Sequence, residues 1–127
     1  MSLVLAVDDE ADILLVVTVI LRHSGHEVLQ ASTGEMALEI LERETPDAML
    51  LDMRLPGIDG LEVLERLRAA RRLATLPVIV VSAFSNPETI ARATEIGCKG
   101  FVTKPFAPDQ LLGTLDDVLR DANHTAA

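Results

Sequence analysis

The sequence predicts an α/β protein built on a five-stranded, doubly wound parallel sheet with helices on both of its faces. Along the 127 residues, five short runs rich in β-branched residues alternate with five longer segments of helical periodicity. The short runs are apolar throughout, which is typical of parallel strands that are buried on both faces. The length suits one domain over residues 1–127, with a core of about residues 3–120.

The predicted strands are short and bounded by turn-forming or polar residues. They are Leu3–Val7, Glu27–Ala31, Ala48–Leu51, Val78–Val81 and Gly100–Thr103. Pro46 and Asp47 separate the third strand from the helix before it, and Pro77 leads directly into the fourth strand.

The first two helices have recognisable start and stop signals. The first is predicted over Ala11–Ser24, because Gly25 follows it as a C-terminal stop. Ser32 and Glu35 are spaced as a capping box, so we expect them to open a second helix that runs to about residue 44.

Three further helices are predicted at residues 61–73, 87–96 and 108–121, with boundaries that are approximate. A turn-rich loop over residues 55–60 precedes the first of them. Asn86 followed by Pro87 is typical of an N-cap and a first helical position, and Pro108 opens the last helix. The polar and small residues 121–127 are expected to fray.

The composition excludes several classes of function. With 11 basic and 20 acidic residues the net charge is −9, so direct binding of nucleic acid is not expected. Three Phe and no Tyr or Trp give little surface for stacking a flavin or a base. The apolar stretch Ile13–Leu21 is too short to span a bilayer, and no signal peptide is visible. The lone Cys98 excludes an intrachain disulfide and fits a reducing cytosol. With no spanning segment or signal peptide, we expect a cytoplasmic protein without membrane contact.

The first helix is apolar on more than one face. One set at helical spacing is predicted to face the sheet: Ile13, Val16, Val17, Ile20 and Leu21. The remaining apolar side chains are predicted to form an exposed patch: Leu14, Leu15 and Val19. The alternative is that these three are scattered surface hydrophobics without a partner.

Acidic residues follow two of the predicted strands directly. Asp8, Asp9 and Glu10 come after the first strand, and Asp52 comes after the third. Ser82 and Lys104 follow the fourth and fifth strands. Ligands of open α/β sheets bind at the carboxyl ends of the strands, so these side chains are expected to converge there. Carboxylates without His or Cys suit a hard cation, most often Mg²⁺. Alternatively, the acids only cap a helix and begin a turn.

Several motifs together resemble the receiver domain of bacterial two-component response regulators, of which the chemotaxis receiver is the simplest member. The motifs are Val7-Asp8-Asp9-Glu10, Asp52, the loop of residues 53–60, Ser82-Ala83, and residues 101–106 with the sequence FVTKPF. The resemblance extends from about residue 3 to residue 120 and implies a flavodoxin-like strand order of 2-1-3-4-5.

The resemblance also implies a role for each residue of the site. Asp52 would be the phosphoacceptor. Mg²⁺ would be bound by Asp9, Asp52 and the backbone carbonyl of Arg54, with Asp8 acting through water. Lys104 would pair with one phosphoryl oxygen and Ser82 would hydrogen-bond another. Ser82 would also act in the switch together with Phe101.

Other expectations rest on the resemblance as well. The Lys104-Pro105 bond would be cis, and Arg54 and Phe84 would prolong the life of the phosphoryl group. The partner would be a sensor histidine kinase or a histidine phosphotransfer protein, docking near the first helix. A homodimer or a contact with an output domain is left open. The domain would not be an enzyme beyond catalysing its own phosphorylation and dephosphorylation.

Two other functions fit the sequence less well than that of a receiver. An aspartyl-phosphate hydrolase of the haloacid dehalogenase type places its nucleophile in a D-x-D motif on the first strand, whereas the candidate nucleophile Asp52 follows the third. A flavodoxin-like carrier needs a phosphate-binding loop after the first strand, where this chain has acids.

Overall fold

A parallel sheet in the order β2-β1-β3-β4-β5 forms the centre of the computed structural model, which describes residues 2–83 and 86–126. The strands are β1 (Leu3–Val7), β2 (Glu27–Ala31), β3 (Ala48–Leu51), β4 (Val78–Ser82) and β5 (Gly100–Thr103). The helices are α1 (Ala11–His23), α2 (Gly34–Arg43), α3 (Gly60–Ala69), α4 (Pro87–Ile96) and α5 (Pro108–Ala126), with a 3₁₀ turn η1 (Arg72–Ala74). The predicted fold class, strand order and five strands are confirmed, and β4 is longer than predicted by Ser82.

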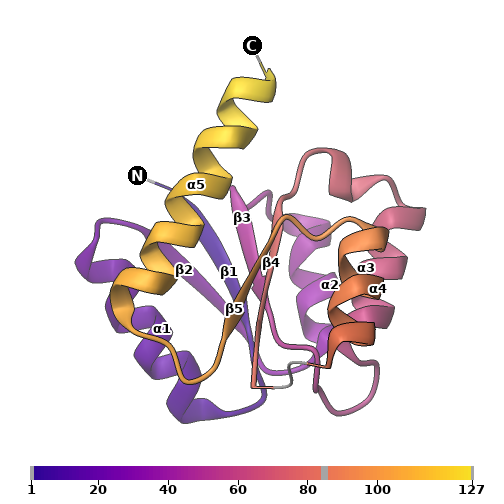
Figure 1. The fold of residues 1–127 in the computed structure, drawn as a ribbon, viewed down its shortest axis with the longest axis horizontal. Helices are drawn as coiled ribbons and strands as arrows, with labels where there is room; N and C mark the ends of the chain where they lie inside the picture. The colour runs from indigo at the N-terminus through magenta and orange to yellow at the C-terminus, as the bar shows by residue number, and fades with distance from the viewer. Residues whose placement is uncertain (1, 84–85, 127) are drawn as a thin grey trace.

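Successive residues of each strand point to opposite faces of the sheet, and each face has its own core. Leu5, Met49 and Val80 face the helices α2, α3 and α4, whereas Val4 and Leu50 face α1 and α5. Figure 1 shows this arrangement, with α1 and α5 on one side of the sheet and the other three helices on the opposite side. This double coverage is the physical reason for strands that are apolar throughout.

The starts of α2 and α3 differ from the prediction. Thr33, not Ser32, is the N-cap of α2, and its hydroxyl accepts a hydrogen bond of 3.0 Å from the backbone N–H of Met36. The predicted capping box is therefore wrong by one residue. Helix α3 begins at Gly60, because the Asp59 side chain caps it by accepting a hydrogen bond from the backbone N–H of Glu62.

The ends of α3 and α5 also differ from the prediction. Helix α3 ends at Ala69, and Arg71 then takes a left-handed conformation, with φ of 60°, that turns the chain into η1. The prediction joined these two elements into one helix. Helix α5 extends to Ala126, beyond its predicted end at about residue 121, since no Gly or Pro interrupts it there. The Lys104-Pro105 bond is cis, as predicted.

The buried face of α1 is the predicted one in part: Val17 and Leu21 are buried as predicted, and Ile13 and Ile20 are half-buried and pack against the same core. The residues that face the sheet are Leu14, Val17, Thr18 and Leu21. Leu14, predicted to be exposed, is buried, whereas Val16, predicted to be buried, is 47% exposed. Leu15 and Val19 are exposed as predicted. The same face carries Thr18, whose buried hydroxyl accepts a 2.7 Å hydrogen bond from the Gln30 amide on β2.

None of the helices among the described residues combines the length and the apolar character that crossing a membrane requires.

Candidate functional site

Three charged residues lie one position beyond the carboxyl ends of their strands: Asp8 after β1, Asp52 after β3 and Lys104 after β5. The backbone N–H of each donates a hydrogen bond of 3.0–3.1 Å to the carbonyl of the last residue of a neighbouring strand, in β2, β1 and β4 respectively. The ladder of the sheet thus continues through these residues and fixes where their side chains begin. The predicted convergence at this edge is confirmed.

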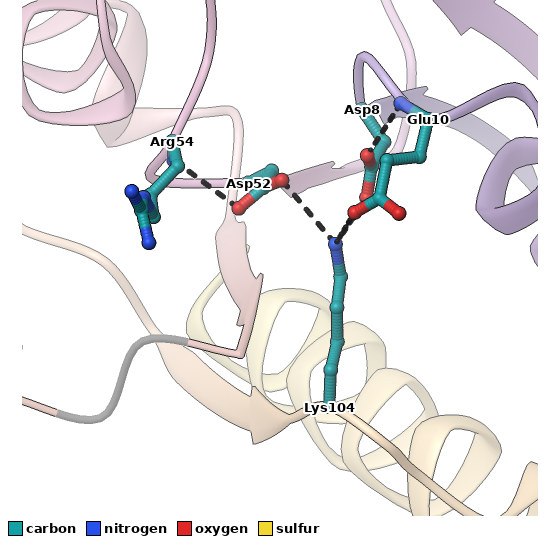
Figure 2. Close-up of polar contacts among 5 residues, drawn as sticks. All are labelled: Asp8, Glu10, Asp52, Arg54 and Lys104. Carbon is teal, nitrogen blue, oxygen red and sulfur yellow. Dashed lines mark hydrogen bonds and ion pairs between the residues drawn. The ribbon is translucent and has the colours of Figure 1, made fainter.

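Lys104 lies between two buried carboxylates. Its Nζ is 2.6 Å from Asp8 Oδ2 and 3.2 Å from Asp52 Oδ2, and only 9% of its side chain is exposed. Figure 2 shows the ammonium reaching from β5 into the space between the two aspartates. The Glu10 carboxylate lies at 3.8 Å from the same ammonium and is largely exposed. One cation therefore faces three carboxylates, so the site carries excess negative charge.

The charge around Lys104 changes its affinity for a proton. Burial lowers the pKa of the Lys104 ammonium by desolvation, but the hydrogen bond to Asp8 and the charge of Asp52 oppose this effect. The result is a pKa above the ordinary value for lysine. Lys104 is therefore a fixed positive charge at neutral pH.

Backbone N–H groups orient the two buried carboxylates. Asp8 Oδ1 accepts a 2.9 Å hydrogen bond from the N–H of Glu10, and Asp52 Oδ1 accepts one of 3.2 Å from the N–H of Arg54. Each carboxylate thus has one oxygen held by its own loop and the other directed at Lys104 (Figure 2). The side chains are positioned before any ligand binds, which reduces the cost of ordering them.

Four carboxylates could hold a metal ion together. The side-chain oxygens of Asp8, Asp9, Glu10 and Asp52 include a set that lies within 4.8 Å of one another. Carboxylate oxygens are the ligands that Mg²⁺ prefers, and the exposed Asp9 and Glu10 leave one side of the group open to water, which Mg²⁺ usually retains. The donor set therefore fits a hydrated magnesium ion. Sequence reasoning noted Glu10 at this position but gave it no role.

A glycine that sequence reasoning did not single out supports the Asp52 loop. A Cβ at Gly60 would lie 2.6 Å from the backbone oxygen of Asp52 and 2.7 Å from the Cα of Met53, closer than real Cβ atoms approach. The N–H of Gly60 donates a 3.0 Å hydrogen bond to the Met53 carbonyl. Helix α3 can begin directly under the loop only because this residue has no side chain. The glycine in the turn-rich stretch was visible in the sequence, but this contact was not.

The two predicted switch residues lie on adjacent strands. Ser82 is fully buried at the end of β4, and its carbonyl accepts from the N–H of Lys104. Phe101 is opposite Val80 in the β4–β5 register and packs, half-buried, against the core beneath α4. The expectation for Phe84 concerns a residue outside the described part of the chain. Cys98 is buried, and burial raises the pKa of its thiol.

Comparisons with known proteins agree with this geometry. Residues 4–116 match the response regulator receiver domain family. The chain is 35% identical to the phosphate regulon transcriptional regulatory protein PhoB of Pseudomonas aeruginosa over 92% of this chain and 51% of that protein. It is 33% identical to the sporulation initiation phosphotransferase F of Bacillus subtilis over 85% of this chain and 86% of that protein.

A solved structure supports the same assignment. The CheY-like receiver domain protein of Methanospirillum hungatei matches with a TM-score of 0.92 at 28% identity, over 98% of both chains. The chain spans about half the length of the first curated relatives it matches, from 48% to 54% of each. On these findings the chain belongs to the response regulator receiver domain family, whose members are signalling domains.

Proposed function

We propose that this receiver domain is a phosphorylation-dependent signalling switch that accepts a phosphoryl group on Asp52. The single observation that supports this most strongly is the Asp52 carboxylate, which is buried among further acids at the carboxyl edge and lies 3.2 Å from the Lys104 ammonium. A buried carboxylate with an oxygen next to a fixed cation is suited to attack a phosphoryl group, because the incoming negative charge is already partly compensated.

The residues that would hold Mg²⁺ are Asp8, Asp9 and Asp52, together with the backbone carbonyl of Arg54. The ion, when bound, offsets the charge of the transferring phosphoryl group. Glu10 is close enough to join through water, since its carboxylate belongs to the same group of acids. These assignments rest on the chemistry of the donor set and on the family.

In the proposed reaction, an Asp52 carboxylate oxygen attacks the phosphorus of a phosphohistidine on the partner. The P–O bond to Asp52 forms as the P–N bond breaks, and its electron pair returns to the imidazole nitrogen. Lys104, which already lies beside Asp52, would pair with a phosphoryl oxygen, and the Ser82 hydroxyl would donate to another. Hydrolysis of the resulting acyl phosphate would return the free carboxylate, so the domain catalyses only its own phosphorylation and dephosphorylation.

The proposed output is a change in the surface formed by α4, β5 and α5. Ser82 ends β4, which pairs with β5 from Ile79↔Gly100 to Ser82↔Thr103, so a movement of Ser82 would act directly on the neighbouring strand. Only Ala93 and Ile96 of α4 are buried, so few apolar contacts oppose a shift of that helix. Rotation of Phe101 toward space that Ser82 vacates would couple the site to this surface.

The proposed partner is a sensor histidine kinase or a histidine phosphotransfer protein. Similarity to a protein named as a phosphotransferase, over most of both chains, supports a place in such a transfer. Contact with an output domain or a second copy remains compatible with this role. The absence of nucleic acid binding, the absence of membrane contact and the cytoplasmic location stay predictions.

The experiment is phosphorylation by acetyl phosphate with Mg²⁺, followed by intact-mass analysis. The wild-type chain should gain one phosphoryl group, and chelation of Mg²⁺ before acetyl phosphate is added should prevent this gain. Asp52→Asn should gain none. Asp59→Asn is the matched control, because Asp59 lies in the same loop but only caps α3, a role that Asn also performs. Phosphorylation of Asp52→Asn, or loss of phosphorylation in Asp59→Asn alone, would contradict the assignment.

The alternative is an aspartyl-phosphate hydrolase of the dehalogenase type. Such an enzyme would turn over a generic phosphate monoester such as p-nitrophenyl phosphate many times. The receiver assignment predicts no turnover above background with the same protein preparation that accepts a phosphoryl group from acetyl phosphate.

A further inference from the structure

The exposed face of α1 carries a stripe of residues that lies outside the acidic site itself. It runs from the acidic site toward the C-terminal end of the helix, and all of its members are exposed. We define the α1 stripe as Asp12, Leu15, Val16, Val19, Arg22 and His23. The spacing of i, i+3, i+4, i+7, i+10 and i+11 places all six on one side of the helix.

The centre of the α1 stripe is apolar. Leu15, Val16 and Val19 are 61%, 47% and 58% exposed. They are three of the four large hydrophobic side chains that are exposed in the described part of the chain. Scattered surface hydrophobics need no explanation, but three adjoining ones on one stripe are typical of a surface that a partner covers.

The two ends of the α1 stripe carry opposite charges. Asp12 lies in the first turn, and Arg22 and His23 lie in the last turn. Among the residues that the structure describes, neither Asp12 nor Arg22 forms an ion pair within the chain. Both charges are therefore available to a partner.

The order of charges along the α1 stripe is self-complementary in one arrangement. When two copies of α1 pack antiparallel about a two-fold axis at position 17, Asp12 of one copy faces Arg22 of the other and Leu15 faces Val19. Each of these contacts occurs twice, as in any isologous interface. A parallel arrangement would instead oppose Asp12 to Asp12 and Arg22 to Arg22.

We propose that the α1 stripe binds a second copy of this chain through antiparallel, two-fold packing of α1 on α1. A helix of 13 residues is about 20 Å long, so the interface is small and the dimer is weak and transient. This proposal is independent of phosphorylation, because it rests on the apolar centre and the charge order alone.

The test is sedimentation equilibrium of the full chain at high concentration and low salt. Asp12→Arg and Arg22→Asp each create two like-charge contacts and should weaken self-association about tenfold or more. An equimolar mixture of the two single variants should associate as hetero-pairs. In such a pair, one copy carries arginine and the other aspartate at both positions 12 and 22, so both charge contacts are attractive. The double variant Asp12→Arg with Arg22→Asp should self-associate again.

Leu15→Gln provides a second test that leaves all charges in place and does not disturb the core, because Leu15 is exposed. It should also weaken self-association, while thermal unfolding followed by circular dichroism should show that every variant remains folded. A wild-type chain that stays monomeric would overturn the proposal. So would a dimer that none of these variants weakens, or a mixture that associates no better than the single variants. A monomeric wild type whose phosphotransfer from a histidine partner is slowed by Leu15→Gln would assign the stripe to that partner instead.

Discussion

Lys104→Met should destabilise the protein strongly in the absence of Mg²⁺, and Mg²⁺ should restore much of the loss. The Lys104 ammonium is 2.6 Å from Asp8 and 3.2 Å from Asp52, and both carboxylates are buried. Methionine has a similar length and no charge, so the variant leaves two buried carboxylates facing each other without a cation. An uncompensated buried charge is among the few changes that cost more than a typical substitution.

The size of the effect follows from the geometry. At an effective dielectric constant of about 20, a pair of opposite charges at about 4 Å attracts by about 4 kcal/mol, and Lys104 has two such partners at shorter distances. Desolvation of the lysine offsets part of this attraction. Removal of one member of a buried pair costs about 3–5 kcal/mol, a large share of a typical total stability of about 5–15 kcal/mol.

The assay is urea unfolding followed by far-UV circular dichroism, because the chain has no Trp or Tyr for fluorescence. Lys99→Met is the matched control: Lys99 is the only other lysine, it is exposed, and the change in net charge is the same. The control should shift the free energy of unfolding by less than about 0.5 kcal/mol. Mg²⁺ should stabilise Lys104→Met more than it stabilises the wild type, since the carboxylates then lack a competing cation.

Two results would refute this reasoning. One is that Lys104→Met unfolds at the same urea concentration as Lys99→Met in the presence of a chelator. The other is that Mg²⁺ stabilises both variants equally, which would mean that Lys104 and the metal do not compensate the same carboxylates.

Three further predictions concern the backbone and the core. Gly60→Ala should lower the free energy of unfolding by about 1–3 kcal/mol, because the new Cβ meets the Asp52 loop. Gly113→Ala in α5 is the control: its Cβ meets nothing, so it should raise the free energy of unfolding by up to about 1 kcal/mol. Equal effects of the two variants in urea titrations would contradict this. Arg71→Gly should raise the midpoint of thermal unfolding, because the left-handed conformation of Arg71 costs a non-glycine residue about 1–2 kcal/mol. An unchanged or lower midpoint would argue against backbone strain at this residue. Burial raises the pKa of the Cys98 thiol, so the native state keeps this proton to higher pH than the unfolded chain does. The free energy of unfolding should therefore fall as pH rises above 9.0. Cys98→Ala should remove this pH dependence, and a pH dependence that persists unchanged would assign it to other groups.

The strands and the site edge could be predicted from the sequence because their signals are local. Each β-branched run is apolar on both faces, so its burial does not depend on which neighbour covers it. Asp8, Asp52 and Lys104 each follow a strand directly, and parallel strands bring their carboxyl ends to the same edge. Their convergence therefore needed only the strand assignments. The resemblance to receivers added the roles.

The tertiary structure decided the features in which several local solutions were nearly equal. Ser32 and Thr33 are both competent N-caps, and only the structure shows that Thr33 takes this position. The close contact between Gly60 and the Asp52 loop could not be predicted, because the pattern of apolar residues does not say how near the two ends of a loop lie. The bridging position of Lys104 likewise required three strands to be assembled first.

Helix α1 shows the limit most clearly. Its sequence is apolar nearly all round, so an apolar stripe can be drawn on more than one face, and the predicted face was displaced from the observed one. The sheet and α5 bury only one side, and on that side the Thr18 hydroxyl accepts a hydrogen bond from Gln30 on β2. Hydrophobic burial is non-directional, so the sequence determined that α1 packs on the sheet, whereas its rotation depended on the assembled surface it packs against, which buries Leu14 and leaves Val16 in solvent.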